Sequence, residues 1–414
     1  MADRTYRYVI VGGGLAGASA VESIRERDQD GTILLLGNEK HLPYHRPPLS
    51  KKLWTGQKNV SQIRVHDFEF YDEKDIDLEM GIEVVAIDPV RKTVTESQGA
   101  SYTFEKLLLA TGGVPRRLSA PGGDIDCICY YRTIDDYLRL RHDLAKGRTA
   151  AIVGGGYIGS EIAAALNGQG IEVTLIMHGS WPARRIFPEG LGMAIKADYI
   201  AHGVRFIDND EPARIDRIVE RYAIQTKEGE RLESDILIVG VGIDPATGLA
   251  RKAGLEVGDG VVVDECLRTS HPDIYAAGDI AFFPYKALGV STRIEHWDNA
   301  LNQGRIVGRN MAGAREPYDY MPYFFSDMFE FGFEAVGDVD AGLDTFADWQ
   351  EENAKGVIYY LRDGQVRGVM MCNVWDKVDA ARALIRKGGK VSESDLRGAI
   401  GVKIDKLLES GTSS

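Results

Sequence analysis

A duplicated glycine motif constrains the fold of this chain of 414 residues more than any other feature. The stretch 8–20 contains an apolar run, a Gly-x-Gly-x-x-Gly turn and an alanine-rich segment, and the same order of residue types returns at 150–162. Each copy leads into a second apolar run, at 32–36 and 172–176. A strand, a glycine turn, a helix and a second strand make up a βαβ unit. Because the unit is repeated, the sequence predicts an α/β protein with two similar parallel-sheet domains.

The glycines of both motifs have the spacing of a dinucleotide-binding turn. They follow a predicted strand directly and precede a predicted helix, so the free N–H groups of the helix N-terminus face a pyrophosphate. Two matches in phase with a duplicated βαβ unit are hard to obtain by chance. We therefore predict two Rossmann-like domains with two dinucleotides that exchange hydride, and FAD with a nicotinamide nucleotide is the common pairing. The motif residues are Gly12, Gly14 and Gly17 in the first copy and Gly154, Gly156 and Gly159 in the second.

The ends of the two repeats indicate how the domains are arranged along the chain. Each repeat closes with an apolar run that ends in glycine, at 105–113 and 234–242. A further strand is predicted at 273–280, beyond the second repeat, so we expect the second domain to be inserted into the first. From Tyr323 onward, strand-like alternation at 356–369 and an amphipathic helix near 380–387 predict a smaller α+β domain. The predicted boundaries are 1–118 with 244–322 for the FAD domain, 119–243 for the NAD(P)H domain and 323–414 for the C-terminal domain.

Charge, cysteine content and hydropathy argue against several classes of protein. The formal net charge of −13 and the lack of basic blocks make nucleic acid an unexpected partner. The cysteines form no Cys-x-x-Cys pair, so neither a disulfide scaffold nor a zinc site is expected, and we predict no metal. No apolar stretch is long enough to span a bilayer and the N-terminus does not resemble a signal peptide, so a cytoplasmic location is expected. The cysteines are Cys127, Cys129, Cys266 and Cys372.

A loop at 44–54 combines paired prolines, which fix the backbone, with basic side chains. Arg46 is a candidate to contact the FAD phosphates, and Lys51 is a candidate to lie beside the flavin, where a cation stabilises the negative charge of reduction. The alternative for Lys51 is a solvated loop lysine. Glu161 lies in the first turn of the second predicted helix, where the helix dipole alone favours an acid. The other interpretation is that Glu161 pairs with Lys51 and lines the hydride path; spacing leaves both open.

The residues after the second strand of each repeat bear on ribose recognition. Asn38 and Glu39 follow that strand in the first repeat, about 20 residues after the glycines, where an acid binds ribose hydroxyls. Position 38 is the more usual place for the acid, and Glu39 is the predicted ligand. The second repeat has no acid at this point, and His178, Arg184 and Arg185 are candidates for a 2′-phosphate. NADPH therefore stays open beside NADH.

Four further motifs, at 46–51, 110–116, 274–279 and 293–300, extend over most of the chain. With them the sequence resembles the FAD-dependent pyridine nucleotide reductases that feed electrons to ferredoxin or rubredoxin, and more particularly apoptosis-inducing factor and its bacterial relatives. The resemblance implies a glutathione-reductase-like fold and favours NADH. It also implies that Arg46, Arg116 and Asp279 contact FAD while Lys51 and Glu161 pair at the flavin. The same motifs and the end of the second repeat supply the other expected cofactor-binding residues: Thr111, Gly112, Gly242, Gly278, Glu295, His296 and Trp297.

The C-terminal third resembles apoptosis-inducing factor specifically, in the stretches 325–327, 333–340 and 357–363. Phe325 stands where that family usually has tryptophan, and Trp297 follows His296 as in the ferredoxin reductases. A mitochondrial targeting and anchoring segment is not found, so a bacterial relative is expected. The polar stretch 409–414 is expected to be frayed.

The resemblance implies hydride transfer from NAD(P)H to flavin N5 and then electron transfer to a small carrier protein of the ferredoxin or rubredoxin type. Dithiol chemistry is not expected, because no cysteine lies near 46–51. A second hypothesis is a redox sensor with slow NAD(P)H oxidation, a persistent charge-transfer complex and redox-dependent dimerisation or partner binding. The expected state is accordingly a monomer or a redox-dependent homodimer. Direct reduction of oxygen or quinones is a third alternative.

Overall fold

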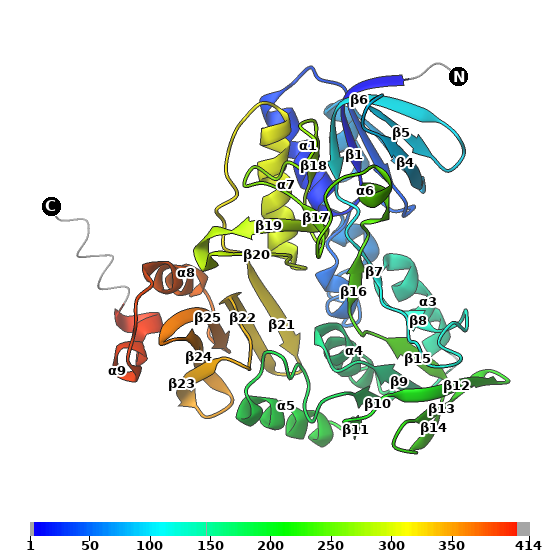
Figure 1. Ribbon diagram of the computed structural model, residues 1–414. Coiled ribbons are helices and arrows are strands. Elements are labelled where there is room, and N and C mark those ends of the chain that lie inside the picture. Colours follow the sequence, from blue (N-terminus) through cyan, green and yellow to red (C-terminus); the bar gives the residue numbers. More distant parts are fainter. Residues whose placement is uncertain (1–3, 146, 404–414) are drawn as a thin grey trace. The chain divides into compact units, whose positions relative to one another are not determined.

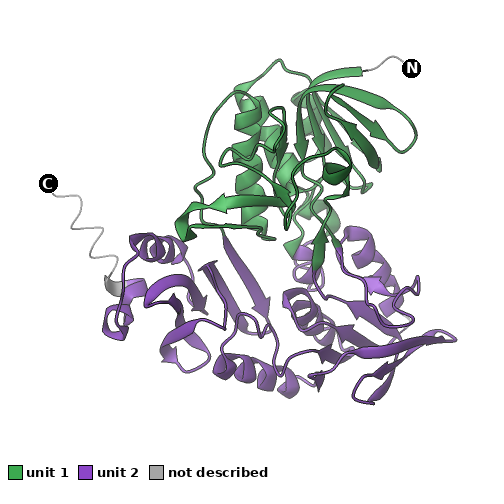
Figure 2. Ribbon diagram, in the orientation of Figure 1, with its two compact units in different colours: residues 1–47, 59–114, 243–322 green, residues 48–58, 115–242, 323–414 purple. Residues whose placement is uncertain are grey.

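The computed structural model of the protein describes residues 4–145 and 147–403 (Figure 1). The chain forms two compact units, each assembled from three segments (Figure 2). The stretch 409–414, expected to be frayed, lies outside the described residues. Among the described residues, no helix combines the length and the apolar character needed to cross a membrane. Unit 1 consists of residues 1–47, 59–114 and 243–322, and unit 2 of residues 48–58, 115–242 and 323–414.

Unit 1 is built on a mostly parallel sheet. Its elements are β1 (Arg4–Val11), α1 (Leu15–Arg27), β2 (Ile33–Gly37), η2 (Val60–Ile63), α2 (Phe68–Glu73), β3 (Ile76–Met80), β4 (Val84–Asp88), β5 (Thr93–Glu96), β6 (Ser101–Leu109), β7 (Gly113–Pro115), β16 (Ile243–Pro245), α6 (Gly248–Lys252), β17 (Val261–Val262), β18 (Ile274–Ala276), β19 (Ala281–Tyr285), η3 (Lys286–Leu288), β20 (Val290–Thr292) and α7 (Trp297–Met311). The strand order is β3-β2-β1-β6-β5-β4, and β18 pairs with β6. Because residues 8–11 are buried throughout, the apolar run of β1 needs cover on both faces of the sheet.

Helices α1 and α7 lie side by side in unit 1 although they are far apart in the sequence (Figure 1). A Cβ atom at Gly304 would lie 2.5 Å from the carbonyl oxygen of Ala16, and one at Gly308 would lie 2.4 Å from that of Ala20. The two helix backbones therefore approach closely because α7 carries glycines where α1 carries alanines. This packing joins the first stretch of unit 1 to its last.

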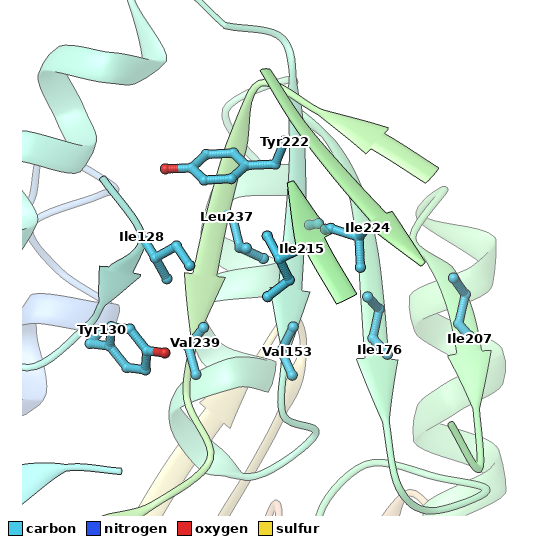
Figure 3. Packing of buried hydrophobic residues seen from close by; sticks show 11 residues of the cluster. Ile128, Tyr130, Val153, Ile176, Ile207, Ile215, Tyr222, Ile224, Leu237 and Val239 are labelled. Atoms are coloured by element: carbon cyan, nitrogen blue, oxygen red, sulfur yellow. The ribbon is translucent and has the colours of Figure 1, made fainter. Parts of the chain in front are cut away.

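The second repeat forms the nucleotide-fold part of unit 2. Its elements are β8 (Cys129–Tyr130), α3 (Ile134–Leu144), β9 (Thr149–Val153), α4 (Tyr157–Asn167), β10 (Glu172–Met177), α5 (Glu189–Ala201), β11 (Arg205–Asp208), β12 (Pro212–Ile218), β13 (Arg221–Thr226), β14 (Arg231–Ser234) and β15 (Ile236–Val239), and η1 (Pro47–Ser50) leads into the short first stretch of this unit. A parallel sheet of order β11-β10-β9-β15-β8 stands beside an antiparallel sheet β12-β13-β14. Ile215, Tyr222 and Ile224 of the small sheet form one buried hydrophobic cluster with Val153 and Val239 of the large one (Figure 3).

The C-terminal part of unit 2 is an antiparallel sheet with helices. Its elements are β21 (Tyr323–Met328), β22 (Phe331–Gly337), β23 (Asp344–Glu351), β24 (Lys355–Arg362), β25 (Gln365–Cys372), α8 (Val378–Lys387), α9 (Glu393–Leu396) and η4 (Ala399–Lys403). The strand order is β21-β22-β25-β24-β23. The alternating stretch predicted around 356–369 is a hairpin, in which Asp363 and Gly364 both have positive φ angles, as a two-residue turn requires. The amphipathic helix predicted near 380–387 is α8.

The predicted strands at the ends of the repeats are shorter than their apolar runs. In the run 105–113, the first part belongs to β6 and the last residue is the first residue of β7. The run 234–242 contains β15, and the predicted strand at 273–280 contains β18. In each case the strand ends before a glycine at which the backbone changes direction. The predicted α/β class, with two dinucleotide-binding folds and a smaller α+β part, is confirmed. The predicted domain boundaries stay a prediction.

Candidate functional site: two glycine turns and a lysine–glutamate cluster

The first glycine turn connects β1 to α1 in unit 1. Gly12 has a φ angle of +131°, and a Cβ atom there would lie 2.1 Å from the carbonyl oxygen of Ala110. A Cβ atom at Gly17 would lie 2.2 Å from the carbonyl oxygen of Gly12, so α1 packs tightly against the turn. Gly14, the N-cap of α1, has no atom within 4 Å of a built Cβ. The turn is closed on its protein side and open over the helix N-terminus, where a pyrophosphate binds in such folds.

The second glycine turn, between β9 and α4 of unit 2, repeats this arrangement. Gly154 has a φ angle of +114°, and its Cβ would lie 2.3 Å from the carbonyl oxygen of Gly240. A Cβ at Gly159 would lie 1.8 Å from the carbonyl oxygen of Gly154, whereas Gly156, the N-cap of α4, has open space around it. Both turns therefore fit a dinucleotide pyrophosphate.

Gly14→Ala is expected to leave folding intact and to weaken FAD binding roughly tenfold or more, because the added methyl group meets no protein atom but fills the space over the helix N-terminus. Gly156→Ala is the matched control, expected to retain FAD and to weaken nicotinamide nucleotide binding instead. Flavin absorbance per protein, the thermal unfolding midpoint and titration with NADH distinguish the two. Full flavin content with unchanged FAD affinity in Gly14→Ala would contradict the assignment of the first turn.

Glu39 and Arg46 of unit 1 form an ion pair. An Arg46 guanidinium N–H donates to Glu39 Oε1 at 2.6 Å, and the Tyr44 hydroxyl donates to Glu39 Oε2 at 2.6 Å. The neighbouring Asn38 is exposed. Asn38 and Glu39 are the two residues predicted to face ribose, and of these Glu39 has a side chain fixed by hydrogen bonds. One of its partners is Arg46, the predicted phosphate ligand.

The predicted FAD contacts from the later part of unit 1 gather around the same loop. The Trp297 indole N–H donates to His45 Nδ1 at 2.9 Å, which ties the start of α7 to the residue before Arg46. The Asp279 carboxylate acts electrostatically on both Arg46 and His296. Desolvation by the surrounding protein lowers the pKa of His296 to about 4, against the attraction of Asp279. His296 is therefore neutral near pH 7, a hydrogen-bonding group and not a cation.

Three other predicted positions of unit 1 make hydrogen bonds to other parts of the same unit. The Thr111 hydroxyl donates to the Ala246 carbonyl at 3.2 Å, and the carbonyl of Gly112 accepts from the N–H of the same alanine. The N–H of Gly278 donates to Gln303 at 2.8 Å. Glu295 differs, because its carboxylate pairs with Arg293 at 2.5 Å.

Lys51 and Glu161 form an ion pair within unit 2. The sequence alone had left open whether these two residues pair. Lys51 Nζ lies 3.1 Å from Glu161 Oε1, and the Lys51 side chain is 12% exposed. Lys51 is therefore not a solvated loop lysine. Asp327 Oδ2 is a second carboxylate partner at 3.3 Å, and the ammonium lies 4.4 Å from the centroid of the Phe325 ring. The cation is thus held by two carboxylates and shielded on one side by an aromatic ring.

Glu161 is buried, with 6% of its surface exposed, yet its carboxylate is fully partnered. The Ser50 hydroxyl donates to Oε2 at 2.5 Å and the Ser326 hydroxyl donates to Oε1 at 2.6 Å, in addition to the Lys51 contact. A buried carboxylate is tolerated only with such donors, and these three come from the η1 loop and from β21. The Lys51–Glu161 cluster, defined here as residues Ser50, Lys51, Glu161, Phe325, Ser326 and Asp327, therefore joins three distant segments of one unit.

Four residues of the Lys51–Glu161 cluster carry no signal in the sequence that marks them as site residues: Ser50, Phe325, Ser326 and Asp327. The motif 325–327 pointed to a family, but nothing in its spacing indicated that it would reach the helix α4. The role of the Lys51–Glu161 cluster in hydride transfer stays a prediction.

The residues predicted to face a nicotinamide nucleotide lie in unit 2. His178 follows β10, and its Nε2 lies 2.5 Å from Glu211 Oε2, a carboxylate that the sequence analysis did not consider. Arg184 and Arg185 are exposed. Arg116, which the resemblance assigns to FAD, also lies in unit 2, where its backbone N–H donates to the carbonyl of Gly242 at 3.0 Å.

The described residues include one group of potential metal ligands and four thiols. Asp198, His202 and Glu330 place ligand atoms within 4.8 Å of one another on the surface of unit 2, where groups of this kind are common without an ion. The four cysteines are free. Burial raises the pKa of Cys129 to about 12, which makes its thiol unreactive.

Comparison with known proteins agrees with this geometry. The family model described as pyridine nucleotide-disulphide oxidoreductase matches residues 6–304, and the C-terminal domain model of mitochondrion-associated apoptosis-inducing factor matches 307–354 and 347–387. The ferredoxin reductase subunit of 5,5′-dehydrodivanillate O-demethylase from Sphingobium sp. (strain NBRC 103272 / SYK-6) is 35% identical over 94% of this chain and 96% of its own. Rubredoxin-NAD(+) reductase of Pseudomonas putida is 36% identical over 80% of this chain and 86% of its own.

A solved structure is similar over the whole length. The ferredoxin reductase for the CYP199A2 system from Rhodopseudomonas palustris superimposes with a TM-score of 0.90 at 27% identity, covering 99% of this chain and 100% of its own. Fold and site together define a flavin-dependent pyridine nucleotide reductase. The chain belongs to the pyridine nucleotide-disulphide oxidoreductase family. It is an oxidoreductase that uses FAD and a nicotinamide dinucleotide, as predicted.

Proposed function

We propose that this protein is a reductase that takes hydride from NADH and passes electrons to a small carrier protein of the ferredoxin or rubredoxin type. The observation that carries the proposal is the Lys51–Glu161 cluster, a buried and fully partnered cation–carboxylate pair beside the second glycine turn. The names of the ferredoxin and rubredoxin reductases among the relatives support the choice of acceptor.

We assign the first glycine turn, Glu39, Arg46 and Asp279 to FAD and the second turn to NADH. The three-domain division predicted from the sequence is kept as part of this proposal, with the C-terminal sheet as the third domain. Bound FAD supplies a hydride acceptor that can release electrons one at a time. Residues Thr111, Gly112, Arg116, Gly278 and His296 complete the proposed cofactor contacts.

In this assignment Lys51 and Glu161 are the catalytic residues. Glu161 accepts hydrogen bonds from two hydroxyl groups and pairs with the Lys51 ammonium, so the oriented carboxylate keeps Lys51 in one position. Lys51 would contribute a fixed positive charge to a flavin held at this cluster, and such a charge stabilises the negative charge of a reduced flavin more strongly in a desolvated site than in water. Phe325 excludes water from one side of the ammonium.

An anaerobic titration with NADH tests the proposal directly. One equivalent is expected to bleach the flavin rapidly, and addition of an oxidised [2Fe–2S] ferredoxin is expected to restore the flavin band while the ferredoxin is reduced. Reduction by NADH followed by oxidation with quinone or oxygen alone, and not with ferredoxin or rubredoxin, would refute the carrier assignment while leaving the reductase class intact.

A redox sensor is a second candidate, favoured by the match of residues 307–387 to the C-terminal domain of apoptosis-inducing factor. Its distinguishing result is slow reduction with a long-lived, long-wavelength charge-transfer band, together with a shift from monomer to dimer on addition of NADH in size-exclusion chromatography. Fast turnover with a ferredoxin excludes it.

A cytoplasmic location is also proposed. Support comes from the four free cysteines, which are usual in reducing compartments. Fractionation of the native cells, with detection by antibody, tests it.

A further inference from the structure

The end of β10 is the part of unit 2 that corresponds to the ribose-binding position of a dinucleotide-binding fold. In a dinucleotide-binding fold the adenosine ribose reaches the carboxyl end of the strand that follows the glycine-turn helix. A Cβ atom at Gly155 would lie 2.8 Å from the Met177 sulfur, so the glycine turn and the end of β10 are in direct contact. Residues 178–188, which follow Met177, contain no acid, and His178 is the first of them.

A segment after β11 supplies an acid at this place. The N–H of Asp210 donates to the Met177 carbonyl at 3.1 Å, and the N–H of Asn209 donates to the Gly179 carbonyl at 3.2 Å. These two backbone hydrogen bonds hold the segment alongside the end of β10. They bring Glu211 Oε2 to 2.5 Å from His178 Nε2.

The position and charge of Glu211 are both maintained by its neighbours. Asp210 is buried, and its Oδ1 accepts from the N–H of Glu211 at 2.7 Å and from that of Glu228 at 3.2 Å. Lys227 pairs with the other oxygen of Glu211. A hydrogen bond from Lys227 lowers the pKa of Glu211, and the charge of His178 acts in the same direction against partial burial. Glu211 is therefore an ionised carboxylate with 31% of its side chain exposed.

We propose that Glu211, rather than an acid that follows β10 in sequence, makes this enzyme select NADH over NADPH. Its carboxylate accepts hydrogen bonds from the ribose hydroxyls. The same carboxylate repels a 2′-phosphate, because the phosphate would have to replace Glu211 as the partner of His178. A phosphate carries about −1.5 to −2 charges near pH 7 and would lie against a like charge. Arg184 and Arg185 are exposed, and among the described residues no side-chain hydrogen bond or ion pair fixes either of them as Glu211 is fixed. The inference rests on the proposed nucleotide site at the second glycine turn.

Binding of two probes to the oxidised FAD-loaded enzyme tests the inference without electron transfer. ADP-ribose and 2′-phospho-ADP-ribose differ only by the phosphate, and isothermal titration calorimetry gives both affinities. The wild type is expected to bind ADP-ribose at least about tenfold more tightly, and Glu211→Gln to reduce that ratio about tenfold, chiefly by tighter binding of the phosphorylated probe. The ratio of kcat/KM for NADH and NADPH is expected to change in parallel.

Glu233→Gln is the matched control, because it removes one exposed carboxylate of the same unit that pairs with Arg221 instead. It is expected to keep the wild-type ratio. His178→Gln retains the Glu211 carboxylate and is expected to keep the preference too. A wild type that prefers the phosphorylated probe, an unchanged ratio in Glu211→Gln, or a preference lost in His178→Gln alone would overturn the assignment to Glu211. Failure of both probes to bind the wild type would instead refute the nucleotide site itself.

Discussion

Lys51→Met is expected to slow reduction of the flavin by NADH by two to three orders of magnitude, about 3–4 kcal/mol of transition-state stabilisation. Methionine has nearly the length of lysine but no charge, so the variant removes the cation from the Lys51–Glu161 cluster with little change in volume. Stopped-flow measurement of flavin bleaching under anaerobic conditions gives the rate. Lys52→Met is the matched control, since Lys52 is the exposed neighbour in the same loop, and it is expected to react as the wild type does.

Loss of the lysine also leaves Glu161 as a buried charge with two serine donors only, which is expected to lower stability. The double variant Lys51→Met/Glu161→Gln removes both charges, so it separates slow chemistry from poor folding. Glu161→Gln alone is expected to have a smaller effect than Lys51→Met, because Asp327 remains 3.3 Å from the ammonium. A Lys51→Met enzyme that keeps its flavin and is reduced within twofold of the wild-type rate would rule out the proposed role of the lysine.

Gly12→Ala is expected to abolish FAD binding and to cost unit 1 more than about 4 kcal/mol of folding free energy. The backbone of Gly12 has a φ angle of +131°, which other residues adopt only with strain, and the added methyl carbon would lie 2.1 Å from a carbonyl oxygen of the neighbouring turn. Soluble yield, flavin content and urea unfolding measure the effect. Gly154→Ala is expected to damage unit 2 in the same way.

Gly170→Ala provides the comparison for backbone strain alone. Gly170 has a φ angle of +78°, but no atom lies within 4 Å of a built Cβ. The expected loss is about 1–2 kcal/mol, with flavin content unchanged. Equal losses at positions 12 and 170 would show that the close contact with Ala110 does not determine the choice of glycine at position 12.

The sequence predicted the parts of the fold that depend on local pattern. The glycine spacing at 12–17 and 154–159 indicated both turns because a tight strand-to-helix connection leaves no room for a side chain. The alternation after residue 356 indicated strands, and its Asp-Gly pair forms the hairpin turn. Boundaries were less well predicted, because an apolar run continues past the point where a glycine ends the strand.

The sequence could not predict contacts that bring together segments far apart in the chain. Glu161 was recognised from its place in α4, but the Ser326 hydroxyl that completes its hydrogen bonding belongs to β21. Likewise His178 was recognised after β10, whereas its partner Glu211 follows β11. Neither contact leaves a spacing signal in one sequence, since both depend on how separate strands are arranged.

The interrupted layout of unit 1 has a consequence for synthesis on the ribosome. Residues 107–109 of β6 can pair with β18, and α1 can pack against α7, only after translation has passed Met311. The parallel sheet of the inserted segment needs nothing beyond Val239. The nascent chain therefore completes the sheet of its second nucleotide fold, although not the packing of α4 on β21, while the first still exposes an unpaired strand edge and an uncovered apolar helix, the kind of surface that chaperones recognise.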